Sequence, residues 1–214
     1  MTGKMLAGIG AAGTASGAGM GGMYLYTKDS IGNQVKDRVL GTGQEFNDSW
    51  KFKFKQMKEE SQDGFPELEN IKTQHSNNEE TGAAALKDWC SKSYSYVYKS
   101  VFSSKDDSRL KKVEKYCIQS LGEKFTSLLT GNHKLLGNGA NENQSEYSTN
   151  FNKIQNYDEA TKGKLPSELK DLKSAEASTK WTVLQGWCKK IQSIPFTEEG
   201  DIFKVGKELC IKTS

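Results

Sequence analysis

The stretch LKDWCSK, residues 86–92, returns later in the same chain as LQGWCKK, residues 184–190. Tryptophan and cysteine are both rare here, with four of each among 214 residues, so two adjacent Trp-Cys pairs need an explanation. A metal site, a redox motif, a disulfide framework and a duplicated packing core are the candidates. Further repeats on either side of the two pairs help to choose among them.

The first recurring stretch lies well before each Trp-Cys pair. RVLGTGQEFNDSW, residues 38–50, resembles KLLGNGANENQSEYSTNF, residues 134–151, and places Leu40 opposite Leu136 at an offset of 96. Each stretch runs from a basic residue through Leu-Gly-x-Gly and a polar spacer to an aromatic residue. The second stretch ends in phenylalanine where the first ends in tryptophan, so the correspondence is weakest at that position.

The second recurring stretch follows each pair. VEKYCIQ, residues 113–119, resembles GKELCIK, residues 206–212, with their cysteines offset by 93, while the Trp-Cys cysteines are offset by 98. Three ordered matches at nearly one offset indicate a tandem duplication, which has to be recognised before any fold is assigned. The sequence therefore predicts one helical repeat unit over residues 29–130 and a second, diverged unit over residues 131–214.

Apolar periodicity within both units is helical, because apolar residues recur three and four positions apart. The members of these faces are Leu110, Val113, Cys117, Leu121 and Leu128 in the first unit, and Trp181, Leu184, Cys188 and Ile191 in the second. Asp201 stands ahead of the last apolar run and is expected to be an N-cap. The predicted fold class is all-α.

Two aromatic segments fit either a helix or a strand. WKFKFK, residues 50–55, alternates like an exposed strand, but its aromatic residues also suit a helix that begins near residues 47–49. Strands need partners and no other segment alternates as well, so we predict a helix. YSYVYK, residues 94–99, is treated as the end of the Trp-Cys helix. The polar segments 73–82 and 137–146 are expected to be loops.

The first 28 residues differ from the rest of the chain. Between Lys4 and Lys28 lie 23 uncharged residues, enough to cross a hydrocarbon core of about 30 Å as a helix. Gly13, Gly17 and Gly21 stand four apart, in the small-xxx-small pattern along which transmembrane helices pack closely. We therefore predict a Gly/Ala-rich membrane anchor or uncleaved signal here, with these glycines as its packing face.

Two other interpretations of this segment stay open. One is a cleaved signal peptide, although no clear Ala-x-Ala site follows the apolar run. The other is a dinucleotide fingerprint, because Gly8, Gly10 and Gly13 formally match G-x-G-x-x-G. That fingerprint needs a buried strand before it, and residues 5–7 are too few to form one. Glycine for membrane packing is the better explanation.

The expected topology is a single membrane pass that leaves residues 29–214 outside the cell. A stub of four residues before the uncharged segment fits a signal anchor whose bulk is exported. The count of flanking basic residues argues the other way, with Lys4 on one side and Lys28, Lys36 and Arg38 on the other.

The four cysteines, Cys90, Cys117, Cys188 and Cys210, fit few chemistries. Their intervals match neither the close spacing of zinc ligands nor the C-x-x-C of redox proteins, and both histidines lie in polar segments. Buried free thiols and disulfides remain. In an exported domain the duplication favours Cys90 with Cys117 and Cys188 with Cys210, because each unit would inherit the same bridge.

No catalytic motif stands out. Walker A fails at each Gly-Lys pair, and the sequence contains no H-E-x-x-H, G-x-S-x-G or EF-hand loop. Of the 30 basic residues only Arg38 and Arg109 are arginines, whereas nucleic-acid recognition favours the planar arginine fork. We therefore predict no enzyme activity, no cofactor, no metal and no nucleic-acid partner.

The segment LAGIGAAGTASGAGMGGMYL, followed by WKFKFK, LKDWCSK, VEKYCIQ and a weaker second round, resembles the uncharacterised paralogous proteins of haemotropic mycoplasmas. The resemblance covers most of the chain as a pattern of segments, and the excess of lysine agrees with such AT-rich genomes. It implies surface exposure and a role in host contact or antigenic variation, and it supplies no functional residues.

The sequence thus predicts a membrane-anchored surface protein that acts by binding or display. Its expected partners are the membrane, through the N-terminal segment, and host surface proteins. The alternatives are a secreted or periphery-bound ligand-binding module with a cleaved signal, and an enzyme that lacks recognisable motifs. The oligomeric state is left open.

Overall fold

The computed structural model describes residues 30–98, 107–137, 139 and 142–212. This part of the chain is predominantly helical, which confirms the all-α fold class, with one two-residue strand pair in addition. The expected membrane segment, with Gly13, Gly17 and Gly21, lies outside the described residues. Within those ranges no helix has both the length and the apolar character that crossing a membrane requires.

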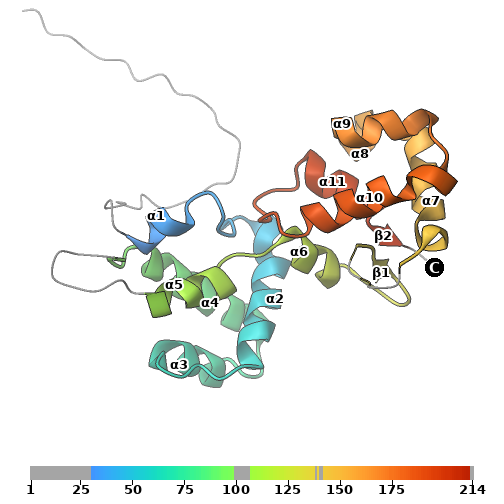
Figure 1. The fold of residues 1–214 in the computed structure, drawn as a ribbon. Helices are drawn as coiled ribbons and strands as arrows, with labels where there is room; N and C mark the ends of the chain where they lie inside the picture. Colours follow the sequence, from blue (N-terminus) through green and yellow to red (C-terminus); the bar gives the residue numbers. More distant parts are fainter. Residues whose placement is uncertain (1–29, 99–106, 138, 140–141, 213–214) are drawn as a thin grey trace, which may run out of the picture.

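Two sets of elements follow each other along the chain, and Figure 1 shows α6 between them. The first set is α1 (Ile31–Val35), the 3-10 turn η1 (Gln44–Phe46), α2 (Asn47–Lys58), α3 (Pro66–Gln74), α4 (Glu79–Tyr94) and α5 (Asp107–Tyr116). After α6 (Leu121–Ser127) and β1 (Lys134–Leu135), the second set is α7 (Gln144–Gln155), α8 (Glu159–Lys162), α9 (Ser167–Lys170), the 3-10 turn η2 (Asp171–Ser174), α10 (Ala177–Ile191), α11 (Asp201–Leu209) and β2 (Ile211–Lys212).

The WKFKFK segment is helical, as predicted. It lies in α2, which places Trp50, Phe54 and Met57 on one buried face, three and four residues apart. The helix continues directly from the 3-10 turn, and Phe46 of that turn is also buried. α2 packs against α4, so the aromatic residues of the first set share one core with the Trp-Cys helix.

The predicted extension of the Trp-Cys helix through residues 94–99 was wrong. α4 ends at Tyr94, and the chain beyond it pairs with the start of α1. Val97 forms an antiparallel bridge with Ser30, and the Ile31 N–H donates to the Tyr96 carbonyl at 2.9 Å. The first N–H groups of a helix have no partner within it, and this bridge supplies one for α1.

Both expected loops are shorter than the polar composition indicated. α3 continues to Gln74, α4 begins at Glu79 and α7 begins at Gln144. Asn78 and Asn143 cap α4 and α7 with their side chains. Acidic residues in these first helical turns are favourable because the N-terminus of a helix carries partial positive charge. Polar sequence was therefore an unreliable sign of a loop here.

The apolar face predicted from Leu110 to Leu128 belongs to two helices instead of one. α5 ends at Tyr116 and α6 begins after Ser120. Ser120 accepts a hydrogen bond from the Glu123 N–H, and the Glu123 carboxylate accepts one from the Ser120 N–H. This reciprocal capping box starts a new helix and frees the intervening backbone to make contacts elsewhere. N-capping of α11 also differs by one residue from the expectation, since Gly200 precedes Asp201 as the cap.

The two sets repeat the same contacts between backbone segments. In the first set the Leu40 N–H donates to the Cys117 carbonyl at 2.9 Å, and in the second the Leu136 N–H donates to the Cys210 carbonyl at 2.8 Å. α7 packs on α10 as α2 packs on α4. Next to the hydrogen bond between Leu136 and Cys210, the strands β1 and β2 pair in antiparallel register.

The structure corrects the expected match between the aromatic residues of α2 and α7. These two helices have equal length, and their starts place Trp50 opposite Tyr147 and Phe54 opposite Phe151. All four side chains are buried. The recurring stretches of the sequence pair Phe151 with Trp50 instead, which shifts the correspondence by one helical turn.

α6 contacts both sets of elements (Figure 1). On one side the ring of Phe125 stacks on Phe203 of α11, with centroids 5.8 Å apart. On the other side the Lys124 ammonium donates to the Ser49 hydroxyl of α2 at 3.3 Å. The buried side chains of the two sets therefore join into a single hydrophobic cluster.

Candidate functional site

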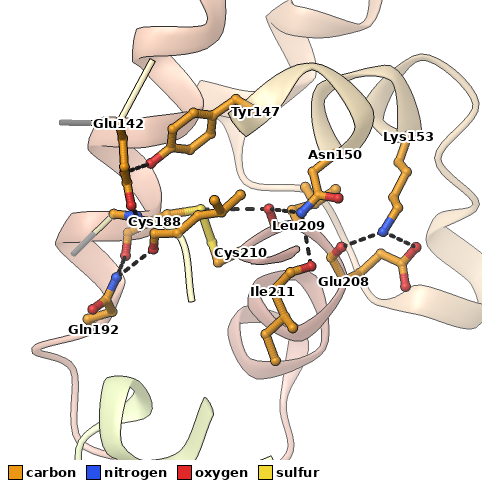
Figure 2. The surroundings of a disulfide bond; sticks show 12 residues. Glu142, Tyr147, Asn150, Lys153, Cys188, Gln192, Glu208, Leu209, Cys210 and Ile211 are labelled. Carbon is orange, nitrogen blue, oxygen red and sulfur yellow. Dashed lines mark hydrogen bonds and ion pairs between the residues drawn. A yellow bond between two sulfur atoms is a disulfide. The ribbon is translucent and has the colours of Figure 1, made fainter. Parts of the chain in front are cut away.

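All four cysteines lie in disulfides. Cys90 of α4 is bonded to Cys117, which follows α5, and their Cα atoms are 5.8 Å apart. Cys188 of α10 is bonded to Cys210, which follows α11, with a Cα separation of 5.5 Å (Figure 2). This is the pairing that the duplication favoured. Loops of 27 and 22 residues imply about 3 kcal/mol of stabilisation each in the chain-entropy description.

The tryptophans of the Trp-Cys pairs lie in the core beside these bridges. Trp89 is buried and meets Phe65 edge-on, with ring centroids 6.5 Å apart. The Arg109 guanidinium lies over both rings and 4.0 Å from the centroid of Tyr96, while it also donates to the Glu67 carboxylate at 2.7 Å. Trp187 is buried to the same extent as Trp89. The Trp-Cys motif thus builds a core and presents no reactive group.

A buried polar side chain occupies the same place in α2 and α7. Lys53 directly precedes Phe54, and Asn150 directly precedes Phe151. The Lys53 ammonium donates to the Lys115 carbonyl at 3.0 Å, near the end of α5. The Asn150 amide donates to the carbonyl of Leu209 at the end of α11, at 3.1 Å, and to that of Ile211 in β2, at 3.0 Å (Figure 2). Lys53 and Asn150 each thus donate to a carbonyl in the last turn of a helix, Lys115 or Leu209, that has no partner within that helix.

The two buried groups differ in charge. Burial lowers the pKa of the Lys53 ammonium, although the hydrogen bond and charge of Glu123 act in the opposite direction. The Glu123 carboxylate lies 2.7 Å from Lys53 and belongs to the capping box of α6. Sequence reasoning missed both Lys53 and Asn150, because Lys53 reads as one of several surface lysines in WKFKFK.

A second polar cluster closes the turn before α7. The Glu142 carboxylate accepts hydrogen bonds from the Gly137 and Gly139 N–H groups, at 2.9–3.1 Å, and from the Tyr147 hydroxyl. Burial acts to raise the pKa of Glu142, but these hydrogen bonds together hold it below its ordinary value. Burial and the Glu142 carboxylate raise the pKa of Tyr147. Gly137 has φ +96°, which a side chain would disfavour.

One hollow on the surface lies beside α11. This α11 hollow has a volume of about 400 Å³ and is lined by Leu128, His133, Lys153, Thr161, Lys162, Lys204, Lys207, Glu208 and Ile211. Glu208 is the only carboxylate among the described residues that line it, and it lies 2.9 Å from the Lys162 ammonium and 3.8 Å from that of Lys153. Lys204 and Lys207 are exposed and form no ion pair with any described residue. The hollow therefore carries excess positive charge.

A second hollow lies beside α5. This α5 hollow has a volume of about 660 Å³ and is lined by Asp63, Gly64, Phe65, Ser108, Arg109, Lys111, Lys112 and Lys115. Lys112 donates to the Gln62 side chain at 3.1 Å, and Lys115 pairs with Glu60. Lys111 is exposed and has no ion pair within the described ranges. This hollow is cationic as well.

A glycine turn before an apolar-proline step also recurs, and the sequence comparison missed it. Gly64, with φ +77°, precedes Phe65-Pro66, and Gly163, with φ +90°, precedes Leu165-Pro166. A positive φ favours glycine, so both positions depend on that residue type. The recurrence is hard to see in the sequence because one extra residue separates glycine from proline in the second stretch.

Among the described residues, no three His, Cys, Asp or Glu side chains gather as a metal site would require. His75 contacts the Thr81 hydroxyl at 2.9 Å, and His133 lines the α11 hollow. The chain matched no protein-family model, no curated protein and no solved structure.

Proposed function

We propose that this protein is anchored in a membrane by residues 1–28 and displays residues 29–214 outside the cell, where it acts by binding. The observation that carries the proposal is the pair of disulfides, Cys90–Cys117 and Cys188–Cys210. Structural disulfides form and persist in oxidising compartments and are rare in reducing ones. The long uncharged segment at the start of the sequence supports the anchor.

The displayed part is proposed to be two tandem, diverged copies of one helical unit, over residues 29–130 and 131–214. The two bridges support this, as do the matching hydrogen bonds to the carbonyls of Cys117 and Cys210. The similar packing of α2 on α4 and of α7 on α10 supports it too. Because each unit would have its own disulfide, its surface residues could diverge while its core is retained.

Binding is proposed in preference to catalysis because the most distinctive sequence motif, the repeated Trp-Cys pair, has a role in folding and none in chemistry. Each Trp-Cys pair lies in a core, with its cysteine held in a disulfide. The resemblance to the paralogous mycoplasma proteins favours host contact or antigenic variation as the purpose of display. The α5 hollow and the α11 hollow are two places on the described surface where a partner could bind.

Protease treatment of intact cells that express the full chain tests the display. Proteinase K added outside should digest residues 29–214, and a cytoplasmic marker protein in the same cells should survive as the control for integrity. Protection of the chain in intact cells, with digestion only after permeabilisation, would contradict the proposed orientation.

Mass spectrometry of the protein isolated with thiols blocked and without reductant tests the redox state. Peptides that join Cys90 to Cys117 and Cys188 to Cys210 are expected. Four alkylated thiols would refute both the bridges and the oxidising compartment that they imply.

A further inference from the structure

We infer that the α5 hollow and the α11 hollow each bind a sulfate group of a sulfated polysaccharide, so that one extended polyanion engages both copies of the unit. The inference specifies the chemical class of the partner in the proposed binding function. It rests on that proposed function for the extracellular location in which the protein would meet the partner. The binding itself is a property of the chain and can be measured apart from display.

The balance of charge in the hollows is the first observation. Four cationic side chains and one carboxylate line the α11 hollow, and four cationic side chains and one carboxylate line the α5 hollow. The whole chain has a formal net charge of only +3 from 30 basic and 27 acidic residues. Arg109 and Lys115 of the α5 hollow are paired with Glu67 and Glu60. The excess positive charge of this hollow therefore rests on Lys111 and Lys112, as that of the α11 hollow rests on Lys204 and Lys207.

The positions of the hollows within the two copies are the second observation. Each hollow lies beside the last helix of its set, directly before the second cysteine of the disulfide. Each also includes residues next to a glycine with positive φ: Gly64 lines the α5 hollow, and Gly163 follows Lys162 of the α11 hollow and packs against Lys204. Both hollows thus border the helix before the second cysteine of their set and lie near a glycine with positive φ, although most of the residues that line them differ.

Within each hollow some ammonium groups are available to an anion. Glu208 occupies Lys153 and Lys162, and leaves Lys204 and Lys207 without an ion pair to any described residue. These two lie three positions apart and are both exposed, on one side of α11. The carboxylate therefore holds part of the site in place, while the exposed pair can neutralise an incoming oxyanion.

The types of side chain favour a sulfated polysaccharide over nucleic acid or lipid. Lysine binds oxyanions as a flexible point charge, whereas base recognition favours arginine forks and single-strand binding uses exposed aromatic platforms. The aromatic residue in the hollows, Phe65, is buried. Two separate hollows suit a long chain with repeated sulfate groups, and sulfated polysaccharides are polyanions of the extracellular space that the disulfides indicate.

A binding assay with the full chain in a neutral detergent tests the inference. A fluorescently labelled, heparin-derived oligosaccharide should bind at about 0.15 M ionic strength, and its unsulfated counterpart should not. The double substitution Lys204→Glu and Lys207→Glu should weaken binding by about tenfold or more, since two attractions become repulsions. Lys111→Glu in the α5 hollow should weaken it further in the same protein.

The matched control changes the same charge elsewhere. Lys180 and Lys189 lie on α10, are exposed and line neither hollow. The double substitution Lys180→Glu and Lys189→Glu should therefore leave the affinity for the oligosaccharide within about twofold of the wild-type value. Thermal unfolding followed by circular dichroism should show that all variants fold. An equal loss of affinity in this control would show that only net charge matters and would overturn the assignment to the hollows.

Competing ligands separate the other sources of anionic groups. Polyphosphate, duplex DNA and vesicles that contain phosphatidylserine enter the same assay as competitors. Binding to one of these but not to the sulfated oligosaccharide would overturn the proposed partner, and no binding to any of them would overturn the site. Binding in solution together with protection from protease on intact cells would support the hollows as the binding site and contradict the proposed display.

Discussion

At the scale of single residues, the interior holds a lysine that helix-end chemistry explains. Lys53 is 2% exposed, and its ammonium reaches both the Lys115 carbonyl and the Glu123 carboxylate. Removing one member of a buried ion pair usually costs more than removing an exposed one, because the remaining groups lose a partner that water does not replace. Glu123 keeps about a third of its surface in solvent, which moderates the loss.

Lys53→Met should lower the free energy of unfolding by about 1–3 kcal/mol, since the Lys115 carbonyl is left without its buried donor. Chemical denaturation monitored by tryptophan fluorescence measures the change. Lys51→Met is the matched control, because Lys51 is also on α2 and pairs with Glu80 in an exposed position. A larger loss for Lys51→Met than for Lys53→Met would contradict the role given to the buried ammonium.

Glu142 should contribute to stability in a manner that depends on pH. Its pKa in the folded protein lies below the ordinary value, so its contribution is present above about pH 4.3 and disappears as pH falls through the lowered pKa. Glu142→Gln should lower the free energy of unfolding by about 1 kcal/mol near neutral pH, because the charge-assisted hydrogen bonds weaken.

Urea denaturation of the wild type and the Glu142→Gln protein at a series of pH values checks this. The difference between them should shrink as the pH is lowered below about 4.3, where the wild-type carboxyl becomes protonated. A difference that stays constant over that range would show that the loss is unrelated to the charge of Glu142.

At the scale of elements, close packing between α2 and α4 depends on one glycine. A Cβ atom at Gly82 of α4 would overlap the ring of Phe54, which is completely buried in α2. A well-packed core does not readily accept extra volume, because side chains must leave their preferred rotamers. The helices can approach as they do only while position 82 lacks a side chain.

Gly82→Ala should destabilise the protein by about 1–3 kcal/mol through this overlap, as measured by thermal unfolding. Gly186→Ala in α10, the other helix with a Trp-Cys pair, is the comparison, since a Cβ there has open space around it. That change should raise stability by about 0.5–1 kcal/mol, because alanine is the better helix former. If Gly82→Ala also raised stability, propensity would outweigh packing and the close approach would not be restrictive.

At the scale of the whole molecule, α6 couples the two sets of elements. Glu123 of α6 holds Lys53 in the first set, and Phe125 of the same helix stacks on Phe203 in the second. Gly206 of α11 lies against Phe125, which brings the two helices close together. The stability of either set should therefore depend on this one short helix.

Phe125→Ala should cost about 3–5 kcal/mol, as expected for removing a buried phenylalanine. Hydrogen exchange read by mass spectrometry should show faster exchange in both α2 and α11. Phe52→Ala serves as the control because Phe52 is only partly buried, and it should have a smaller effect. Faster exchange confined to α11 would show that the two sets are stabilised independently.

The sequence alone determined the helical class, the three recurring stretches and the cysteine pairing that the duplication favours. These follow from spacing along the chain: apolar residues three and four apart, and cysteines whose offsets of 98 and 93 match. The errors occurred where spacing carries little information. Residues 94–99 appeared to continue a helix, and the capping box at Ser120 interrupted a face that looked continuous.

The packing of the helices decides which polar residues are buried and where positive charge collects. Lys53 looks like any surface lysine until Lys115 and Glu123, 62 and 70 positions away, come to it. The lysines of the α11 hollow likewise come from α7, α8 and α11. Burial and electrostatic environment depend on neighbours distant in sequence, whereas helical period and repeat spacing depend on neighbours along it.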